Sequence, residues 1–332
     1  MAHPAPSLDR LEQVRLTRDG QGVDFRGEWL VDADLRGVNL TGADLRDCDL
    51  SRADLRGATL AQADLRGCTL FEARLDGAEF MGARLENANL AEANATQAGF
   101  GMARLDGACL VGAKLERATL TGAILDTADL RGTVLTQARL RECSLVGAEF
   151  DGANLREADL SDAVVDDCSF RRADLRRARL GGITGYTHAS WVGADLRNAD
   201  FVGAYLLRRF ALDQNFLAEF QAQGPLNKLI YGFWKATSDC GRSLGRWGLW
   251  TLLLAVVYAG LYSGVNIDYG DHETWLSPLY FSVVTLTTLG YGDALPTDVL
   301  SQAVVISQVL LGYFMLGGLL SIFAAKMSRR GE

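Results

Sequence analysis

The sequence lacks the residue groupings that most metal and catalytic sites need. It has six cysteines but no CxxC pair, and its three histidines, His3, His188 and His272, lie far apart. A zinc centre is therefore not expected. No nucleophile–base constellation and no glycine-rich nucleotide fingerprint is visible, which argues against an enzyme and against a nucleotide-binding regulatory domain. We expect no organic cofactor.

Three further absences concern location and partners. The start of the sequence has no apolar core of a signal peptide, so we expect the N-terminal part to stay in the reducing cytoplasm. The formal net charge is −8, and residues 25–206 contain 21 basic and 28 acidic side chains, so a nucleic-acid-binding surface is not expected. No arginine-rich helix precedes the first long apolar run, which excludes a voltage sensor of that kind.

What the sequence does contain is a five-residue repeat. From 25 to 180, every residue whose number is a multiple of five is Leu, Phe or Val, with Ala95 as the one exception. The position two residues earlier is small, with Ala at 24 of 32 positions and Cys at four more. After Leu180 one extra residue enters, and the pattern then continues to Leu206. A repeat array is the first feature to settle, because it determines the fold.

Neither a helix nor a flat strand has a period of five. A coil that turns a corner every five residues fits, because it directs one large and one small side chain inward on each side. The recurring phrase A(D/N)LxG, as in ADLRG, resembles the pentapeptide-repeat family. That resemblance implies a right-handed, four-sided β-helix over residues 23–206. With 20 residues per coil we expect about nine coils, roughly 43 Å long at the ~4.8 Å spacing of bonded strands.

The 20-residue coil predicts which side chains stack. Cys48 and Cys68 should lie above one another, as small residues that fill an inside corner rather than as a disulfide. Asp44 and Asp64 should also stack, with their repulsion offset by arginines two residues along. We interpret such outer rows as solvated charge ladders and not as a binding site.

Two apolar runs near the C-terminus predict membrane spans. Residues 247–267 and 299–325 carry no charge and are long enough to cross a bilayer as helices. Arg242 and Arg246 precede the first run and Lys326, Arg329 and Arg330 follow the second, whereas the connecting segment has acidic residues and no Lys or Arg. The positive-inside rule therefore predicts a multi-pass protein of the plasma or inner membrane with both termini cytoplasmic.

Residues 207–246 join the repeat to the first span. The stretch up to Gln223 has a helical apolar stripe, which suits equally a cap on the repeat or a helix in the membrane interface. The stretch from Pro225 mixes aromatic and basic residues, and an interfacial helix is favoured there. We therefore divide the chain into an N-terminal segment (1–22), the β-helix (23–206), a helical linker (207–246), a pore domain (247–326) and a cytoplasmic tail (327–332).

Between the two spans lies WLSPLYFSVVTLTTLGYGD. Its first part predicts a helix too short to cross, followed by a glycine-containing turn outward. Such re-entrant backbone occurs at membrane depth only where protein or a water-filled path surrounds it. Gly290 and Gly292 permit left-handed backbone, which can turn successive carbonyl oxygens toward one axis, where they replace the hydration shell of a cation.

At these residues the chain resembles a two-span potassium channel, although Leu289 stands where Val is usual. The resemblance implies that K⁺ is held by filter carbonyls and by the Thr288 hydroxyl; the implied filter residues are Thr288, Leu289, Gly290, Tyr291 and Gly292. Thr287, Asp293 and Tyr280 would support the filter, with the Tyr280 hydroxyl bonded to Asp293. Tyr291 would pack its ring against the pore helix.

Gly312 lies 20 residues after Gly292, where many channels of this family have the hinge of the inner helix. Close helix packing is the alternative explanation of that glycine. Leu320 and Ala324 are candidate inner-gate residues by the same alignment. One filter strand cannot surround an ion, so a homotetramer in the lipid bilayer is expected.

The predicted function is therefore a potassium-selective channel whose cytoplasmic repeat domain modulates gating or assembly, or binds an unknown protein or ligand on its surface. Two alternatives stay open. One is a membrane-anchored interaction protein of the DNA-mimic type, as some acidic pentapeptide-repeat relatives are. The other is a weakly selective cation channel, against which Tyr291 argues.

Overall fold

The computed structural model describes residues 8–270 and 273–328, and the chain divides into two compact units, Met1–Ala218 and Glu219–Glu332. Residues 1–7 of the predicted N-terminal segment, residues 271–272 of the segment that connects the two apolar runs and residues 329–332 of the predicted tail lie outside the described residues. The first unit contains helix α1 (Leu8–Thr17), the repeat and the start of α2 (Tyr205–Ala222).

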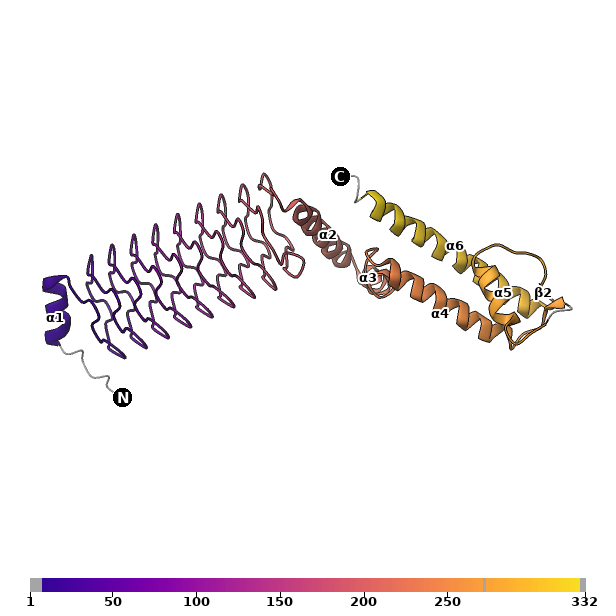
Figure 1. Cartoon of the computed structure of the whole chain (residues 1–332), viewed down its shortest axis with the longest axis horizontal. Coiled ribbons are helices and arrows are strands. Elements are labelled where there is room, and N and C mark those ends of the chain that lie inside the picture. Colours follow the sequence, from indigo (N-terminus) through magenta and orange to yellow (C-terminus); the bar gives the residue numbers. More distant parts are fainter. Residues whose placement is uncertain (1–7, 271–272, 329–332) are drawn as a thin grey trace. The chain divides into compact units, whose positions relative to one another are not determined.

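The repeat folds into a stack of coils, hereafter the rod (Figure 1). Parallel bridges join every fifth residue to the one 20 positions further on, from Asp19↔Asn39 to Val164↔Thr184. Four bridging positions per coil make it four-sided. From Ser169↔Ser190 the offset is 21, which is where the extra residue after Leu180 enters. The coils begin at Asp19, earlier than the predicted Val23.

Three backbone hydrogen bonds per side hold neighbouring coils together: Leu45 N donates to Asp64 O (2.7 Å), Asp47 N to Arg66 O (3.0 Å) and Asp64 N to Ala43 O (2.9 Å). The corner between sides needs one left-handed residue, supplied by glycine at Gly42 (φ 66°) and by a polar residue at Asp47 (φ 57°). The large and small inward positions are buried almost without exception. Each buried Leu or Phe is worth roughly 1.5–3 kcal/mol of desolvation.

Aromatic side chains stack inside the rod where the repeat places them one coil apart. Phe80 lies on Phe100 with ring centroids 4.7 Å apart. Phe170 lies between Phe150 (5.1 Å) and Trp191 (4.5 Å), with nearly parallel planes. The rod core is therefore a continuous column rather than a set of separate clusters.

The predicted cysteine stacking carries a chemical consequence. All six cysteines are free thiols. Burial raises the pKa of Cys48, Cys143 and Cys168 to about 12, and raises that of Cys68 well above its usual value. The Sγ of Cys48 donates to the Phe25 carbonyl oxygen at 2.7 Å. These residues fill inside corners, as the sequence predicts.

Four thiols should therefore resist alkylation in the native protein. At pH 8 we expect the partly exposed Cys109 and Cys240 to react with iodoacetamide at least about tenfold faster than the four buried ones, because only the accessible thiolate reacts. Mass spectrometry of timed samples measures this. A fast reaction at Cys68 in folded protein would contradict the described core.

The outer rows are paired charges. Asp44 and Asp64 lie one above the other in neighbouring coils, as predicted, and are paired through a backbone β-bridge. Arg46 and Arg66 each bind the aspartate two residues before them through two guanidinium nitrogens. The side-chain hydrogen bonds from these arginines hold the pKa of both carboxyls below its usual range. Exposed pairs of this kind contribute little stability each, but they leave few carboxylates unpaired on this face.

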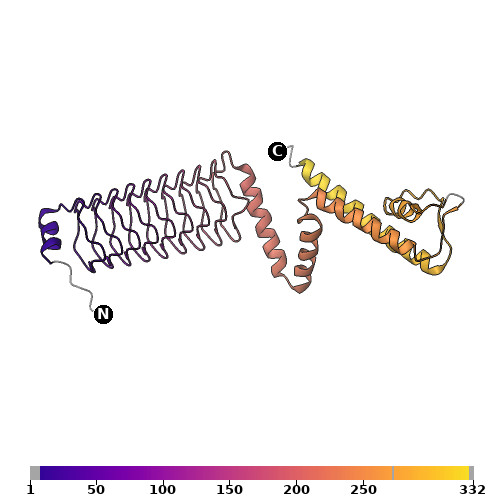
Figure 2. The same ribbon diagram turned by 60° about the horizontal axis from the view of Figure 1, so that its bottom comes forward.

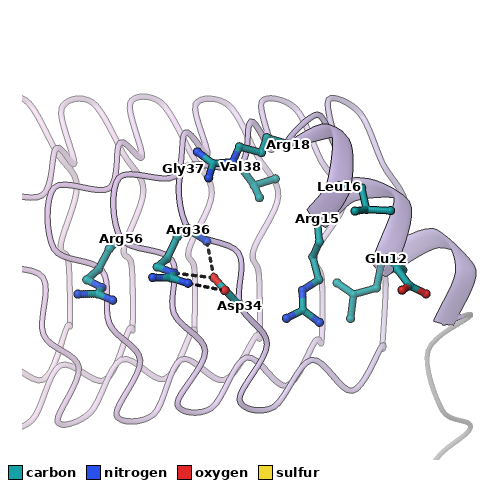
Figure 3. A pocket seen from close by; sticks show the side chains of 10 residues that line it. Glu12, Arg15, Leu16, Arg18, Asp34, Arg36, Gly37, Val38 and Arg56 are labelled. Atoms are coloured by element: carbon teal, nitrogen blue, oxygen red, sulfur yellow. Dashed lines mark hydrogen bonds and ion pairs between the residues drawn. The ribbon is translucent and has the colours of Figure 1, made fainter.

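Helix α1 covers the first coils through Val14, which is buried, and Leu11. A hollow of about 740 Å³ lies beside α1 (Figure 3). Its charged lining continues the arginine ladder of the coils: Arg36 is bound to Asp34 by Nε (2.8 Å) and Nη2 (2.7 Å), and Arg56 follows one coil on. The N-terminal end of the rod core is thereby shielded by a helix.

Helix α2 covers the last coils. Leu207 and Ala211 are fully buried in the rod core, and the ring of Phe210 meets that of Tyr186 edge to face. Two amide side chains of α2 accept hydrogen bonds from the last coil: Gln214 Oε1 from Trp191 N (2.7 Å) and Asn215 Oδ1 from Gly193 N (2.6 Å). In earlier coils the corresponding N–H groups donate to carbonyl oxygens of the next coil. The sequence left two roles open for this stretch, a cap on the repeat or a helix in the membrane interface, and the first half of α2 takes that of a cap.

The second unit is helical (Figure 2). It contains α3 (Pro225–Ser238), α4 (Leu244–Tyr262), β1 (Ile267–Asp268), α5 (Ser277–Leu286), β2 (Leu295–Pro296) and α6 (Val299–Ser328). Helices α4 and α6 are long and apolar enough to cross a membrane. The views show them side by side, with α5 near the β1–β2 end, and α5 contacts both.

The helix boundaries differ from the predicted segments at two places. The helix predicted from Pro225 ends at Ser238, because Asp239 and Cys240 take left-handed backbone (φ 51° and 54°), and Ser243 then caps α4 by accepting from Arg246 N. The first apolar run leaves the helix after Tyr262 instead of continuing to residue 267. The last residue of this run, Ile267, pairs instead with Pro296 in the antiparallel strand pair β1–β2.

Candidate functional site

The candidate site begins where α5 ends. Pro278 in the first turn starts the helix without an N–H group to satisfy. After Leu286 the backbone remains hydrogen-bonded to the last turn of α5: Thr288 N donates to Thr285 O and Leu289 N to Val284 O, both at 3.1 Å. The Thr287 hydroxyl donates to Val283 O at 2.8 Å. The segment that follows thus has a fixed starting direction.

The backbone of this segment, residues 288–292, alternates in sign of φ. Thr288 (57°), Gly290 (51°) and Gly292 (78°) have positive φ, whereas Leu289 and Tyr291 between them do not. Only glycine adopts this geometry without cost, so Thr288 is a strained exception. Strain of this kind concentrates at ligand-binding and switch positions. Alternation of this type can turn successive carbonyl oxygens to one side of a strand, as the sequence predicts for an ion path.

Two residues beside the segment are tied together. The Tyr280 hydroxyl donates to Asp293 Oδ2 at 2.7 Å.

A second group of hydrogen bonds lies further along the chain, at the start of α6. Asn266 Nδ2 donates to Asp298 Oδ2 (2.9 Å), and Asp298 Oδ1 accepts from Ser301 N (2.7 Å) to cap α6. The backbone N–H of Ser301 is the first of the groups that hold the pKa of the Asp298 carboxyl below its usual range.

Removing the Tyr280 hydroxyl should destabilise the segment. Without this hydroxyl the Asp293 carboxylate loses a hydrogen-bond donor beside the segment, so Tyr280→Phe is expected to accelerate current decay at least about fivefold in planar bilayers. Tyr231→Phe on α3 is the matched control and should leave the decay unchanged. An unaltered decay in Tyr280→Phe would mean that the Tyr280–Asp293 bond does not support the segment 288–292 that the sequence predicts as a filter.

The remaining predicted residues lie in different surroundings. Leu289 and Tyr291 are 60% and 66% exposed, so within one chain little of the Tyr291 ring is covered. A hollow of about 340 Å³ is lined by the 288–292 segment together with Val305, Val309 and Tyr313 of α6. Leu320 and Ala324 lie further along α6, both exposed. Their role at an inner gate stays a prediction.

Gly312 has a clear packing reason to be glycine. A Cβ atom there would come 2.5 Å from the Leu286 carbonyl oxygen, at the end of α5. Helix α6 runs without interruption from Val299 to Ser328 through this point. Close packing, the alternative to the hinge, thus accounts for the residue in this structure, and the hinge stays a prediction.

Sequence reasoning missed a buried polar cluster that joins the three helices. Tyr262 on α4, Ser282 on α5 and Gln308 on α6 are hydrogen-bonded to one another or to a neighbouring backbone, and all three are at most 1% exposed. The available signal was Gln308 itself. An uncharged but strongly polar residue inside a 27-residue apolar run indicates an internal partner.

Two family models match the chain: pentapeptide repeats, in eight copies over residues 21–183, and an ion channel domain over residues 248–329. A calcium-gated potassium channel, TvoK of Thermoplasma volcanium, is 29% identical over 72 residues, which are 20% of this chain and 21% of that protein. The chain thus matches about a fifth of the length of this relative.

Solved structures match the rod. QnrB1, a plasmid-mediated fluoroquinolone resistance protein in trypsin-treated form, is 24% identical with a TM-score of 0.51, covering 57% of this chain and 95% of its own. HetL, a pentapeptide repeat protein of the cyanobacterium Nostoc, is 29% identical with a TM-score of 0.35, covering 58% and 92%. The QnrB1 likeness bears on the fold alone. The coil stack, the repeat match and the match over residues 248–329 together show that the chain joins a pentapeptide-repeat domain to an ion channel domain.

Proposed function

We propose that the protein is a potassium-selective channel in which residues 288–292 of four copies form the filter. The observation that carries the proposal is the alternation of positive and negative φ from Thr288 to Gly292, fixed at its start by the end of α5. Backbone carbonyls aimed at one axis replace the hydration shell of K⁺ without any charged ligand. The Thr288 hydroxyl is a further ligand at the cytoplasmic end.

A single chain supplies only one side of such a path, so four copies must meet around an axis. The exposure of Leu289 and Tyr291 and the hollow beside Tyr313 support this assembly, because in a tetramer a neighbouring subunit covers these apolar surfaces. Helices α4 and α6 present further exposed apolar side chains, including Leu252, Val256, Leu310 and Phe323, to lipid or to partner subunits.

The test is ion flux through the purified protein. In liposomes loaded with K⁺, we expect flux that is at least tenfold faster for K⁺ than for Na⁺, and crosslinking in detergent should give a four-chain product. Equal K⁺ and Na⁺ flux would favour the weakly selective channel, and no flux from intact tetramers would favour the anchored interaction protein.

The rod, in this proposal, acts on the pore through the segment 207–246. Its surface gives the DNA-mimic alternative little support, because carboxylates such as Asp44, Asp54 and Asp64 are paired with arginines instead of forming an anionic stripe. Deleting residues 1–206 and recording single-channel open probability tests the coupling. An unchanged open probability in intact tetramers would remove it.

A further inference from the structure

A chain of hydrogen bonds crosses the inside of the channel unit. The Tyr262 hydroxyl of α4 donates to Gln308 Oε1 at 2.6 Å. Gln308 Nε2 donates to the Ser282 hydroxyl (2.7 Å) and to the Ser282 carbonyl oxygen (3.1 Å). The Ser282 hydroxyl in turn donates to Ala255 O on α4 at 2.7 Å. This series of hydrogen bonds thus starts and ends on α4 and passes through α6 and α5.

Every polar atom of the Gln308 side chain is used. Oε1 accepts one hydrogen bond, and the two Nε2 protons are donated to two different oxygens of Ser282. Gln308 and Ser282 are both 0% exposed and Tyr262 is 1% exposed. An unsatisfied amide in such surroundings is costly, so these partners hold each other in one arrangement. A side chain that only filled space would not need an amide here.

The bonds lie next to the filter segment. Ser282 is on the same short helix whose Val284 and Thr285 carbonyls hold the N–H groups of Leu289 and Thr288. One helical turn further on, α6 touches α5 again, where Gly312 leaves room for the Leu286 carbonyl oxygen. Gln308 and Gly312 are four residues apart on one face of α6, as are Ser282 and Leu286 on α5. The two helices are therefore fastened and closely packed at consecutive turns.

We propose that Gln308 is a positioning residue of the selectivity filter. This inference rests on the channel function proposed above. Gln308 fixes the rotation and depth of α5 relative to α4 and α6, and α5 in turn fixes where the carbonyls of Thr288 and Leu289 point. A displacement of α6 at this level is passed to the filter through the Gln308–Ser282 bonds rather than absorbed in loose packing.

The test uses the full-length tetramer with three variants: Gln308→Leu, Ser282→Ala and Tyr262→Phe. Ser307→Ala is the matched control, because Ser307 is the adjacent α6 residue and its hydroxyl lies 2.9 Å from that of Tyr258, outside the chain of bonds. The K⁺/Na⁺ permeability ratio is measured from reversal potentials. Amide hydrogen exchange of residues 287–293 is followed by mass spectrometry, a readout that does not depend on selectivity.

We expect Gln308→Leu to lower the permeability ratio at least tenfold and to accelerate exchange of the 287–293 peptide at least tenfold, with exchange in the rod unchanged. Ser282→Ala should have a similar effect, and the double variant Gln308→Leu/Ser282→Ala no larger one than either single, because both remove the bond between Gln308 Nε2 and the Ser282 hydroxyl. Ser282→Thr, which keeps the hydroxyl, should stay within twofold of wild type. Tyr262→Phe should give a smaller change of about threefold in the same direction.

The inference is overturned if Gln308→Leu and Ser282→Ala form tetramers whose permeability ratio and 287–293 exchange both stay within twofold of wild type. It is equally overturned if Ser307→Ala has the same effect as Gln308→Leu, since the helix pair would then respond to the loss of any hydrogen bond between α4 and α6. If Gln308→Leu does not assemble, Ser282→Ala and Tyr262→Phe decide by the same thresholds. A wild-type channel without selectivity would refute the proposed function, and the exchange comparison would still decide whether Gln308 positions the segment.

Discussion

Replacing Gly290 with alanine is expected to reduce potassium flux by at least about a hundredfold. Gly290 has φ 51°, and within one chain no atom of the described residues lies within 4 Å of the position that a Cβ would take. The penalty is therefore conformational: a left-handed alanine costs roughly 1–2 kcal/mol. In the proposed tetramer four such residues meet in one ion path, a total of roughly 4–8 kcal/mol if the strain is retained, and relaxing it turns the carbonyl away from the path.

The measurement is K⁺ flux in liposomes at equal tetramer content. Gly317→Ala is the control, because a Cβ at Gly317 also meets no atom of the described part of the chain within 4 Å, whereas the backbone there is helical, within α6. That variant should keep wild-type flux. If Gly290→Ala conducts as well as Gly317→Ala, the left-handed backbone at Gly290 is not needed and the carbonyl filter is wrong.

Replacing Phe170 with alanine is expected to destabilise the rod by about 3–5 kcal/mol, the usual cost of emptying a buried aromatic site. Phe170 is 0% exposed and is stacked on both sides, so the neighbouring rings of Phe150 and Trp191 both lose contacts. In a unit of this length the change corresponds to a melting temperature lower by roughly 6–20 °C. The effect should be strongest near the α2 end, since neighbouring coils depend on each other.

Circular dichroism of the full chain during heating measures the change, and proteolysis locates the coils that open first. Met102→Ala is the control: Met102 is 74% exposed on the same rod and should shift the melting temperature by no more than about 2 °C. An equal shift in the two variants would mean that the stacked column does not hold the coils together.

Much of the rod could be predicted because its repeat is written in the sequence. The period of five fixes which side chain points inward, and the single extra residue after Leu180 reappears as the change of bridge offset from 20 to 21. The caps could not be predicted in the same way. That Gln214 and Asn215 accept from Trp191 N and Gly193 N depends on how α2 lies across the last coil, and no local pattern encodes that placement.

At the candidate site, the predicted residues from Thr287 to Asp293 form one continuous segment because they are adjacent in sequence. The partners that hold this segment come from three helices separated by many residues, so Ser282 and Tyr262 carried no recognisable motif. Gly312 illustrates the remaining limit: its spacing from Gly292 suggested a hinge, whereas the nearness of the Leu286 carbonyl, a tertiary fact, gives it a packing role.

The amides of Gln214 and Asn215 have a consequence beyond the stability of the last coil. A bare stack end is a growth surface, because its unbonded N–H groups can recruit an extended segment from another molecule. Here those groups are already occupied by side chains that belong to a helix and cannot be extended. The last coil is therefore closed at these two positions, where no N–H group is left for a strand of another molecule to bind.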